Sequence, residues 1–178
     1  FSNLTGFKHT GHFVNAQPYS DGRRAGAIVF HNRLGVKAAE FCSHGRIFAA
    51  ELSWGGWGIL VIDAHMDAHG DRVPYQVSLN DLVHVIEQTP HGHIMIIGAD
   101  AQEQLGPQRA FDDRSLIGEH VMGHRGWKGD RFLQAMHEFR LALPHTFVSG
   151  FESRYTCINN GRSEPKQMDY MAATAPLR

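Results

Sequence analysis

Residues 96–106 read IIGADAQEQLG, an apolar run that ends in a carboxylate, Asp100, followed two residues later by an amide, Gln102. The run begins upstream as HIMIIG (residues 93–98), and such a continuous apolar stretch predicts a strand covered on both faces. Asp is also a common turn residue, so an ordinary strand end remains possible. Residues two apart on an extended chain point to the same side, so we expect Asp100 and Gln102 to project together.

The rest of the chain predicts further strands and two helices. Gly55-Gly56 is typical of a tight hairpin turn. We expect the first helix to begin at the N-cap Ser78 and the second to end before Pro144. The predicted strands are residues 25–32, 46–54, 57–66, 93–98, 145–149, 153–158 and 166–173, and the predicted helices are residues 78–88 and 130–143. The first three strands, joined by short loops, favour an antiparallel meander.

Length and composition indicate one α/β or α+β domain spanning residues 1–178. The hydrophobic fraction of 42% is ordinary for a globular protein. The net charge of −1 does not indicate a surface that is basic overall and would bind a polyanion. No apolar run approaches the length of a membrane span. Nothing in the sequence indicates oligomerisation. The chain begins at Phe1 rather than Met, so we expect a fragment or a processed product.

A second candidate for chemistry is DAHMDAHGD, in which acidic and histidine side chains alternate with small or apolar ones. Its polar members are Asp63, His65, Asp67, His69 and Asp71. If the strand continued through them, period two would place all five on one face. His and Asp are zinc ligands, and this stretch resembles the His-x-Asp stretch of zinc-dependent aminoacylase-type peptidases. A zinc amidohydrolase using His65 and Asp67 is therefore one alternative, and a strand end that breaks into a polar loop is another.

Several short motifs occur in an order that resembles the endonuclease/exonuclease/phosphatase superfamily, the group of exonuclease III and the retroelement-type endonucleases. They are GRRAGAIVF (residues 22–30), DAHMD (63–67), GADAQ (98–102), IGEHVMGHRGWKGDRFLQAM (117–136), Thr156-Cys157, Asn160-Gly161-Arg162 and MDYM (168–171). GADAQ resembles the family's Gly-Asp-Phe-Asn, with Gln102 in place of Asn. The resemblance covers nearly the whole chain and rests on the order of the motifs.

The resemblance implies a fold and a reaction. The fold would be a four-layer sandwich of two packed mixed β-sheets flanked by helices. The reaction would be Mg²⁺-dependent phosphodiester hydrolysis by a retroelement-type endonuclease acting on nucleic acid, with DNA preferred over RNA. Mg²⁺ suits this chemistry because it takes oxygen ligands, keeps several waters and needs only one or two carboxylates. The protein would be intracellular, and nuclear if it is part of a retroelement.

The resemblance also implies roles for four residues. Asp100 would bind the metal and orient the attacking water, while Gln102 would donate to a phosphate oxygen. His65 would contact the scissile phosphate, where an imidazole can donate a hydrogen bond or carry charge near neutral pH. Asp169 would orient the catalytic His of a later Ser-Asp-His motif. A solvent-facing His65 and a structural Asp169 are the alternatives to these roles.

Other residues are candidates for nucleic-acid binding. The loop at residues 118–129 contains Arg125 and Lys128, which we expect to dock backbone phosphates. The three Trp side chains could stack on bases where they are exposed. Core packing is the expected role of Trp57, because it begins an apolar strand.

The chain also departs from the family pattern at both ends. No Glu occurs in residues 1–39, where the family's metal-binding Glu would be sought, and no Ser-Asp-His follows Asp169. We therefore expect a domain that is incomplete at both termini. A catalytically inactive fragment, structural or nucleic-acid-binding only, is the alternative to an active endonuclease.

Overall fold

The computed structural model describes residues 11–15, 27–31, 37–68, 71–149, 156 and 166–175, with the backbone alone up to residue 44. The elements are the strands β1 (Gly11–Asn15), β2 (Ala27–His31), β3 (Lys37–His44), β4 (Ile47–Trp54), β5 (Trp57–His65), β6 (Ile94–Asp100), β7 (Leu141–Ala142) and β8 (Asp169–Thr174), the helices α1 (Arg72–Glu87) and α2 (Trp127–Glu138), and the 3-10 helix η2 (Pro144–Phe147). The fold class is α/β, as the sequence predicts.

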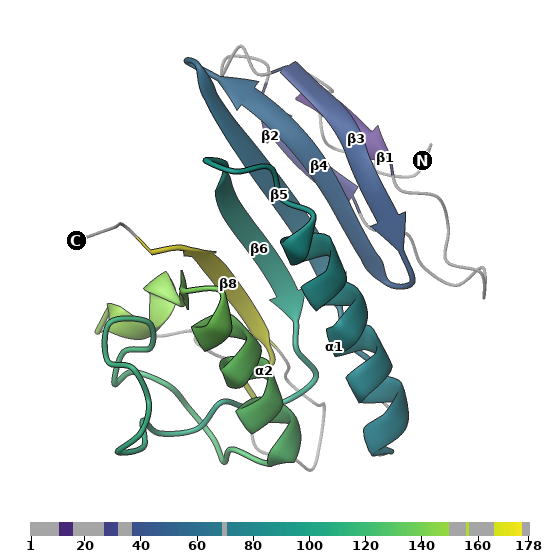
Figure 1. Cartoon of the computed structure of the whole chain (residues 1–178). Coiled ribbons are helices and arrows are strands. Elements are labelled where there is room, and N and C mark those ends of the chain that lie inside the picture. Colours follow the sequence, from purple (N-terminus) through teal and green to yellow (C-terminus); the bar gives the residue numbers. More distant parts are fainter. Residues whose placement is uncertain are drawn as a thin grey trace.

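A mixed sheet of six strands organises this part of the chain, in the order β3-β4-β5-β6-β8-β7. β5 and β6 are parallel, and α1 makes the crossover between them. All other neighbours in this sheet are antiparallel. β1 and β2 pair in a separate two-stranded sheet, with β1 beside β3 and β2 beside β5. Both helices lie on the other side of the main sheet (Figure 1).

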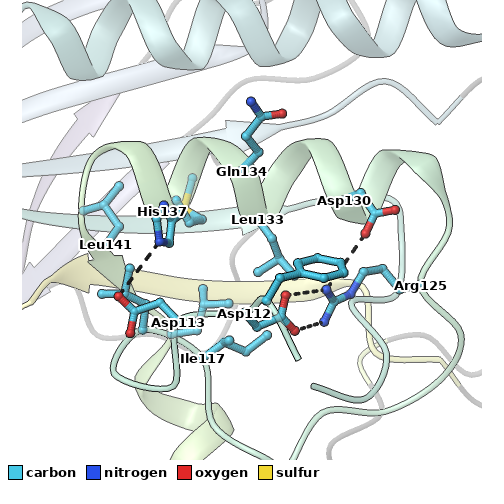
Figure 2. A pocket seen from close by; sticks show the side chains of 13 residues that line it. Asp112, Asp113, Ile117, Arg125, Asp130, Leu133, Gln134, His137 and Leu141 are labelled. Carbon is cyan, nitrogen blue, oxygen red and sulfur yellow. Dashed lines mark hydrogen bonds and ion pairs between the residues drawn. The ribbon is translucent and has the colours of Figure 1, made fainter. Parts of the chain in front are cut away.

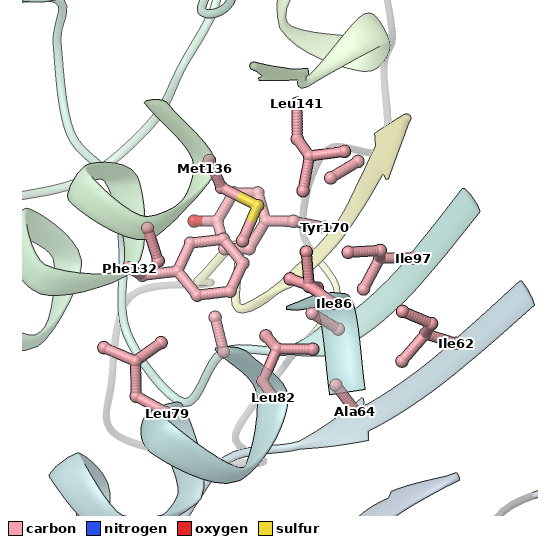
Figure 3. Packing of buried hydrophobic residues seen from close by; sticks show 14 of the residues in the cluster. Ile62, Ala64, Leu79, Leu82, Ile86, Ile97, Phe132, Met136, Leu141 and Tyr170 are labelled. Atoms are coloured by element: carbon pink, nitrogen blue, oxygen red, sulfur yellow. The ribbon is translucent and has the colours of Figure 1, made fainter. Parts of the chain in front are cut away.

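Period-two alternation divides the main sheet into two faces. Leu60, Ile62 and Ala64 of β5 point into the core that the helices cover, and all three are at most 1% exposed. The intervening Ile59 and Val61 pack on the opposite face, with a smaller cluster from β4. Figure 3 shows the larger core, to which α1 contributes Leu79, Leu82 and Ile86, α2 contributes Phe132 and Met136, and β8 contributes Tyr170. Burial of each such large apolar side chain contributes about 1.5–3 kcal/mol.

The strand order differs from the predicted meander. β1 and β3 were not predicted, and the strand expected at residues 25–32 pairs with β1 in the small sheet. The meander is instead β3-β4-β5, whose first turn contains Gly45 at a φ of +55°. Residues 37–44, KAAEFCSH, lack the clear apolar alternation of a half-buried strand, so sequence pattern did not reveal β3.

Both helices begin earlier than predicted. α1 starts at Arg72, so Ser78 is inside the helix, where its hydroxyl donates to the carbonyl of Pro74 at 3.2 Å. Pro is tolerated in the first turn of a helix because its missing N–H would have no intrahelical partner there. α2 starts at Trp127 after Gly126, and it ends at Glu138 rather than before Pro144.

Three further expectations about packing are wrong. β6 is buried on the helix side only, since Ile94 is 37% exposed and Gly98 is also exposed on the other side. Trp57, expected in the core, is 60% exposed at the tip of the β4–β5 hairpin. Pro144–Phe147 forms a 3-10 helix where a strand was predicted.

Within the described ranges, no helix combines the length and apolar character that a membrane crossing requires. The predicted strand at 153–158, apart from Thr156, and the motif at 22–26 lie outside the described residues.

Candidate functional site

Three of the four predicted catalytic residues lie side by side at one edge of the main sheet. In the parallel pairing of β5 with β6, His65 is the partner of Asp100. In the antiparallel pairing of β6 with β8, Asp100 is the partner of Asp169. Alternation along each strand places these three side chains on the face opposite the helices, because Ala64, Ala99 and Tyr170 occupy the helix-covered core.

His65 and Asp100 contact each other directly. The imidazole Nδ1 lies 3.1 Å from Oδ2 of the carboxylate, and the two side chains are 18% and 28% exposed. The strand pairing extends one residue further, since the backbone N–H of Met66 donates to the carbonyl of Asp100 at 2.9 Å. A carboxylate bound to one imidazole nitrogen fixes the ring orientation and leaves the other nitrogen available for proton exchange.

Gln102 completes the surroundings of the Asp100 carboxylate. Its backbone N–H donates to Oδ1 at 3.2 Å, and its side-chain amide donates to Oδ2. The chain turns here, because Gln102 has a φ of +52°. The premise that Asp100 and Gln102 lie on one extended segment is therefore wrong. The amide reaches back to hold the carboxylate, which then has donors on both oxygens.

Asp169 begins β8, and Thr156 fixes this strand end. The Thr156 hydroxyl oxygen accepts the backbone N–H groups of Met168 and Asp169, at 2.8 and 3.0 Å. The Asp169 side chain is exposed beside Asp100. Thr156 was part of a motif in the sequence but received no role, because nothing local indicates which backbone groups its hydroxyl would meet.

Tyr170 joins β8 to the loop that follows β6. Its hydroxyl accepts the N–H of Leu105 at 3.1 Å and donates to the carbonyl of Gln167 at 2.8 Å. Burial raises the pKa of Tyr170, so the phenol remains protonated at physiological pH. Tyr170 is part of the MDYM motif, but the sequence did not predict that its hydroxyl links β8 to the loop after β6. The apolar environment that makes the hydroxyl a structural link is a tertiary feature.

The described residues supply only part of a metal centre. The oxygen donors of Asp100 and Asp169 are of the kind that Mg²⁺ takes. Among the residues that the structure describes, however, no group of three His, Cys, Asp or Glu side chains is arranged to hold a metal ion. The chemical type of the donors fits Mg²⁺, and the described set does not by itself complete a site.

Among the described residues of this stretch, no three His and Asp side chains are arranged to hold a metal ion such as zinc. Asp67 is buried and forms an ion pair with Arg46 at 3.4 Å, whereas His65 pairs with Asp100. Asp71 is exposed at the start of α1, and His69 lies outside the described residues. The strand ends at His65, so the period-two argument does not extend to the later residues of this stretch.

Arg125 is not placed to meet a nucleic acid. Its side chain is 1% exposed, and its guanidinium binds both oxygens of Asp112, at 2.8 and 2.7 Å. It also donates to the carbonyls of Leu105 and Pro107. The prediction of a phosphate contact is therefore corrected for Arg125, which holds the long loop after β6 to the start of α2. Lys128 lies near the surface, with Nζ 5.0 Å from the ring centre of Tyr75.

A cavity of about 350 Å³ lies between this loop and α2. Figure 2 shows the side chains that line it, in which the apolar Leu133 and Ile117 lie near the acidic Asp112, Asp113 and Asp130. These acids already have partners, since Asp112 binds Arg125 and Asp130 binds Arg109 at 2.8 Å. None of the four predicted catalytic residues lines this cavity.

Comparison with solved structures identifies proteins that share this fold. No protein-family model and no curated protein matches the chain. The chain resembles the solved endonuclease domain of TRAS1, a telomere-specific non-LTR retrotransposon, with a TM-score of 0.60 and 12% identity over 93% of this chain and 67% of that one. It is also similar to D. rerio TDP2 complexed with single strand DNA product, with a TM-score of 0.61, 10% identity and coverages of 93% and 62%.

A third match names the superfamily. An endonuclease/exonuclease/phosphatase family protein from Bacteroides thetaiotaomicron aligns with a TM-score of 0.54 and 11% identity, over 93% of this chain and 61% of that chain. The described structure therefore has the fold of the endonuclease/exonuclease/phosphatase superfamily, which confirms the resemblance seen in the sequence. The chain spans only about three fifths to two thirds of the length of these structures.

Proposed function

We propose that the chain forms part of a Mg²⁺-dependent phosphodiester hydrolase of the retroelement endonuclease type, and that His65, Asp100 and Asp169 mark its reaction site. The observation that carries this proposal is the strand register, which sets these three side chains next to one another on one face. The shared fold supports the reaction class, because an endonuclease domain and endonuclease/exonuclease/phosphatase family proteins occur among the matched structures.

The proposed architecture is a four-layer sandwich. The helices and the main sheet form two layers, and the β1–β2 sheet lies against the opposite face of the main sheet (Figure 1). This second sheet would form the third layer. The exposed part of the same face, which includes Ile94 and Met171 at 37% and 55% exposure, is where such a layer would extend.

The proposed chemistry uses the contacts around Asp100. Its carboxylate accepts from Gln102 and contacts His65, so the imidazole is held with one nitrogen toward Asp100. The opposite nitrogen could then accept a proton from water, or donate to a phosphate oxygen when the ring is protonated. Asp100, with Asp169 beside it, would hold Mg²⁺. The metal would supply positive charge to the phosphate oxygens.

We propose nucleic acid as the substrate, with DNA preferred over RNA. The D. rerio structure similar to this chain contains a single strand DNA product, which supports this choice. An intracellular location, nuclear in the case of a retroelement, follows from the same proposal. Lys128, near the surface at the same end of the main sheet as the candidate site, is the proposed contact for backbone phosphate.

A catalytically inactive protein with this fold is the second candidate. It is favoured by the absence, within the described ranges, of a three-ligand metal cluster. On this ground we propose that the 178-residue chain alone shows no appreciable Mg²⁺-dependent nicking of plasmid DNA. Under the first candidate, a version extended by any native flanking sequence at both ends would cut.

Plasmid nicking tests these two candidates. In the extended protein, Asp100→Ala should lower the rate about 100- to 1,000-fold, as loss of one preorganised electrostatic contributor does. Asp113→Ala removes a carboxylate outside the proposed site and serves as the matched control. A folded extended protein that does not cut in Mg²⁺ would support the inactive alternative. Strong nicking by the short chain, abolished by Asp100→Ala, would show that the described residues suffice.

A further inference from the structure

Two cations are held on one aromatic pair at the start of the two helices. The rings of Tyr75 in α1 and Trp127 in α2 meet edge to face, with centres 6.1 Å apart. The Arg72 guanidinium carbon lies 5.4 Å from the ring centre of Trp127. Lys128 Nζ lies 5.0 Å from that of Tyr75. We call these four residues the cation–aromatic cluster.

The cluster lies at the end of the main sheet where β5 and β6 terminate, which is also the end of the candidate site, but on the face that the helices cover. Lys128 Nζ donates to the backbone carbonyl of Asp67 at 3.4 Å, and Asp67 is two residues beyond His65. Tyr75, which is fully buried, also donates from its hydroxyl to the carbonyl of Lys128 at 3.3 Å. These bonds tie the start of α2 to α1 and to the end of β5.

The rings reduce the freedom of both cations. A flexible Arg or Lys side chain loses rotamer freedom when it is immobilised, and this loss opposes ligand binding. A cation–π contact offsets part of that cost before a ligand arrives. Arg72 is exposed and Lys128 is half-buried, so their polar groups remain near the surface while the rings hold their positions.

Both cations and acidic side chains surround the cluster, so an anion is attracted by the two cations rather than by a positive charge over the whole surface. Asp67 is engaged by Arg46 at 3.4 Å, so its charge is balanced. Asp71 precedes Arg72 in the chain, and Glu103 acts electrostatically on Tyr75. The site therefore has two prepositioned cations with acidic neighbours, which suits the spaced charges of a phosphate backbone better than a single dense anion.

We propose that the cation–aromatic cluster holds backbone phosphates of a DNA strand at the end of the main sheet where the candidate active site lies. The choice of DNA as ligand rests on the proposed function. Arg72 and Lys128 would neutralise phosphates and fix the position of the strand, without reading its bases. The rings of Trp127 and Tyr75 would act indirectly, by keeping the two cations in place.

The experiment measures binding of a fluorescein-labelled DNA duplex by anisotropy, in EDTA and over a series of NaCl concentrations. Each phosphate contact contributes about 0.9 to the slope of log affinity against log salt. Arg72→Gln and Lys128→Gln should each reduce the magnitude of the slope by about that amount. Arg114→Gln removes an exposed Arg in the loop after β6 and should leave the slope unchanged.

Trp127→Phe gives the sharper measurement. It retains both cations but weakens the ring contact with Arg72, so affinity should fall a few-fold while the slope stays the same. Circular dichroism of each variant shows whether it is folded. The proposal is overturned if Arg72→Gln and Lys128→Gln keep the wild-type slope, or if Trp127→Phe changes the slope as a charge loss would.

Competition with polyglutamate tests whether the ligand is DNA. Equal affinity for polyglutamate, with the same dependence on Arg72 and Lys128, would make the cluster a general anion site and overturn the assignment. The result is separable from the proposed function, because EDTA prevents metal-dependent cleavage. In the extended protein, unchanged slopes with intact nicking would remove only this proposal, and the expected slopes without nicking would remove only the proposed reaction.

Discussion

His65 on β5 and Asp100 on β6 meet at the same level of two parallel strands, with imidazole Nδ1 3.1 Å from carboxylate Oδ2. A carboxylate next to Nδ1 favours the form of the ring that carries a proton there. Asp100→Asn removes the negative charge and should shift neutral His65 toward the tautomer protonated at Nε2. Long-range ¹⁵N–¹H spectra of the imidazole would report this change. An unaltered tautomer ratio in the Asn variant would show that Asp100 does not orient the ring.

The Arg125–Asp112 ion pair should be essential for stability. Both side chains are buried, at 1% and 6% exposure, and loss of one partner leaves the other charge without compensation. Arg125→Met should lower the free energy of unfolding by about 3–5 kcal/mol, measured by urea denaturation. The double variant Arg125→Met/Asp112→Leu should recover much of this loss. If the double variant is no more stable than Arg125→Met, the cost does not come from the unpaired carboxylate.

Asp112 should make the protein sensitive to acid. Burial alone would raise the pKa of Asp112, but hydrogen bonds from Arg125 and from the Arg109 backbone, with the charges of both, lower it overall. A lowered pKa in the folded state stabilises the fold fully above the unfolded pKa, at about pH 4. This contribution is lost as the pH falls through the folded pKa.

The measurement is the free energy of unfolding between pH 7 and pH 2, compared with Asp112→Asn. The pKa of Asp113 is also lowered, by hydrogen bonds from Ser115, and the Asn variant leaves Asp113 in place. The difference between the two curves therefore isolates Asp112. The difference should be largest above about pH 4 and shrink at lower pH. A constant difference would contradict the assigned pKa shift.

Two glycines should respond differently to alanine. A Cβ on Gly118 would lie 2.2 Å from the carbonyl oxygen of Thr146 and 2.8 Å from the Cα of Phe147, which are backbone atoms that cannot move cheaply. Gly118→Ala should therefore destabilise the protein by about 1–3 kcal/mol. Gly98→Ala, where no atom lies within 4 Å, is the matched control and should be neutral or slightly stabilising. Thermal unfolding of both variants distinguishes close packing from a general intolerance of Ala.

The sequence by itself predicted most of the central elements. The apolar runs before Asp100 and His65 gave β5 and β6 nearly to the residue, and the Gly55-Gly56 turn between β4 and β5 was also correct. These features are local, because alternation, turn residues and helical periodicity operate within one segment. The resemblance to the superfamily also came from the sequence, through the order of motifs, and the structural matches confirm that fold.

Burial and orientation were not determined locally. The predicted environments of Arg125 and Trp57 were both wrong. Arg125 was expected at the surface and is buried, whereas Trp57 was expected in the core and is exposed. A guanidinium can be buried only when carboxylate and carbonyl acceptors converge on it, and here they come from the loop after β6. The turn at Gln102 likewise depends on the carboxylate of Asp100 rather than on the Ala-Gln sequence.

The sequence predicted that His65 and Asp100 would lie at or just beyond strand ends and that Asp169 would lie within a strand at residues 166–173, whereas β8 begins at Asp169. Only the tertiary structure determined that they are neighbours, because register is fixed by hydrogen bonds between strands far apart in the chain. A shift of one residue in β6 or β8 would turn its carboxylate to the helix-covered face. The apolar side chains of Ile97, Ala99 and Tyr170 prevent that shift, since they occupy the core only in the observed register.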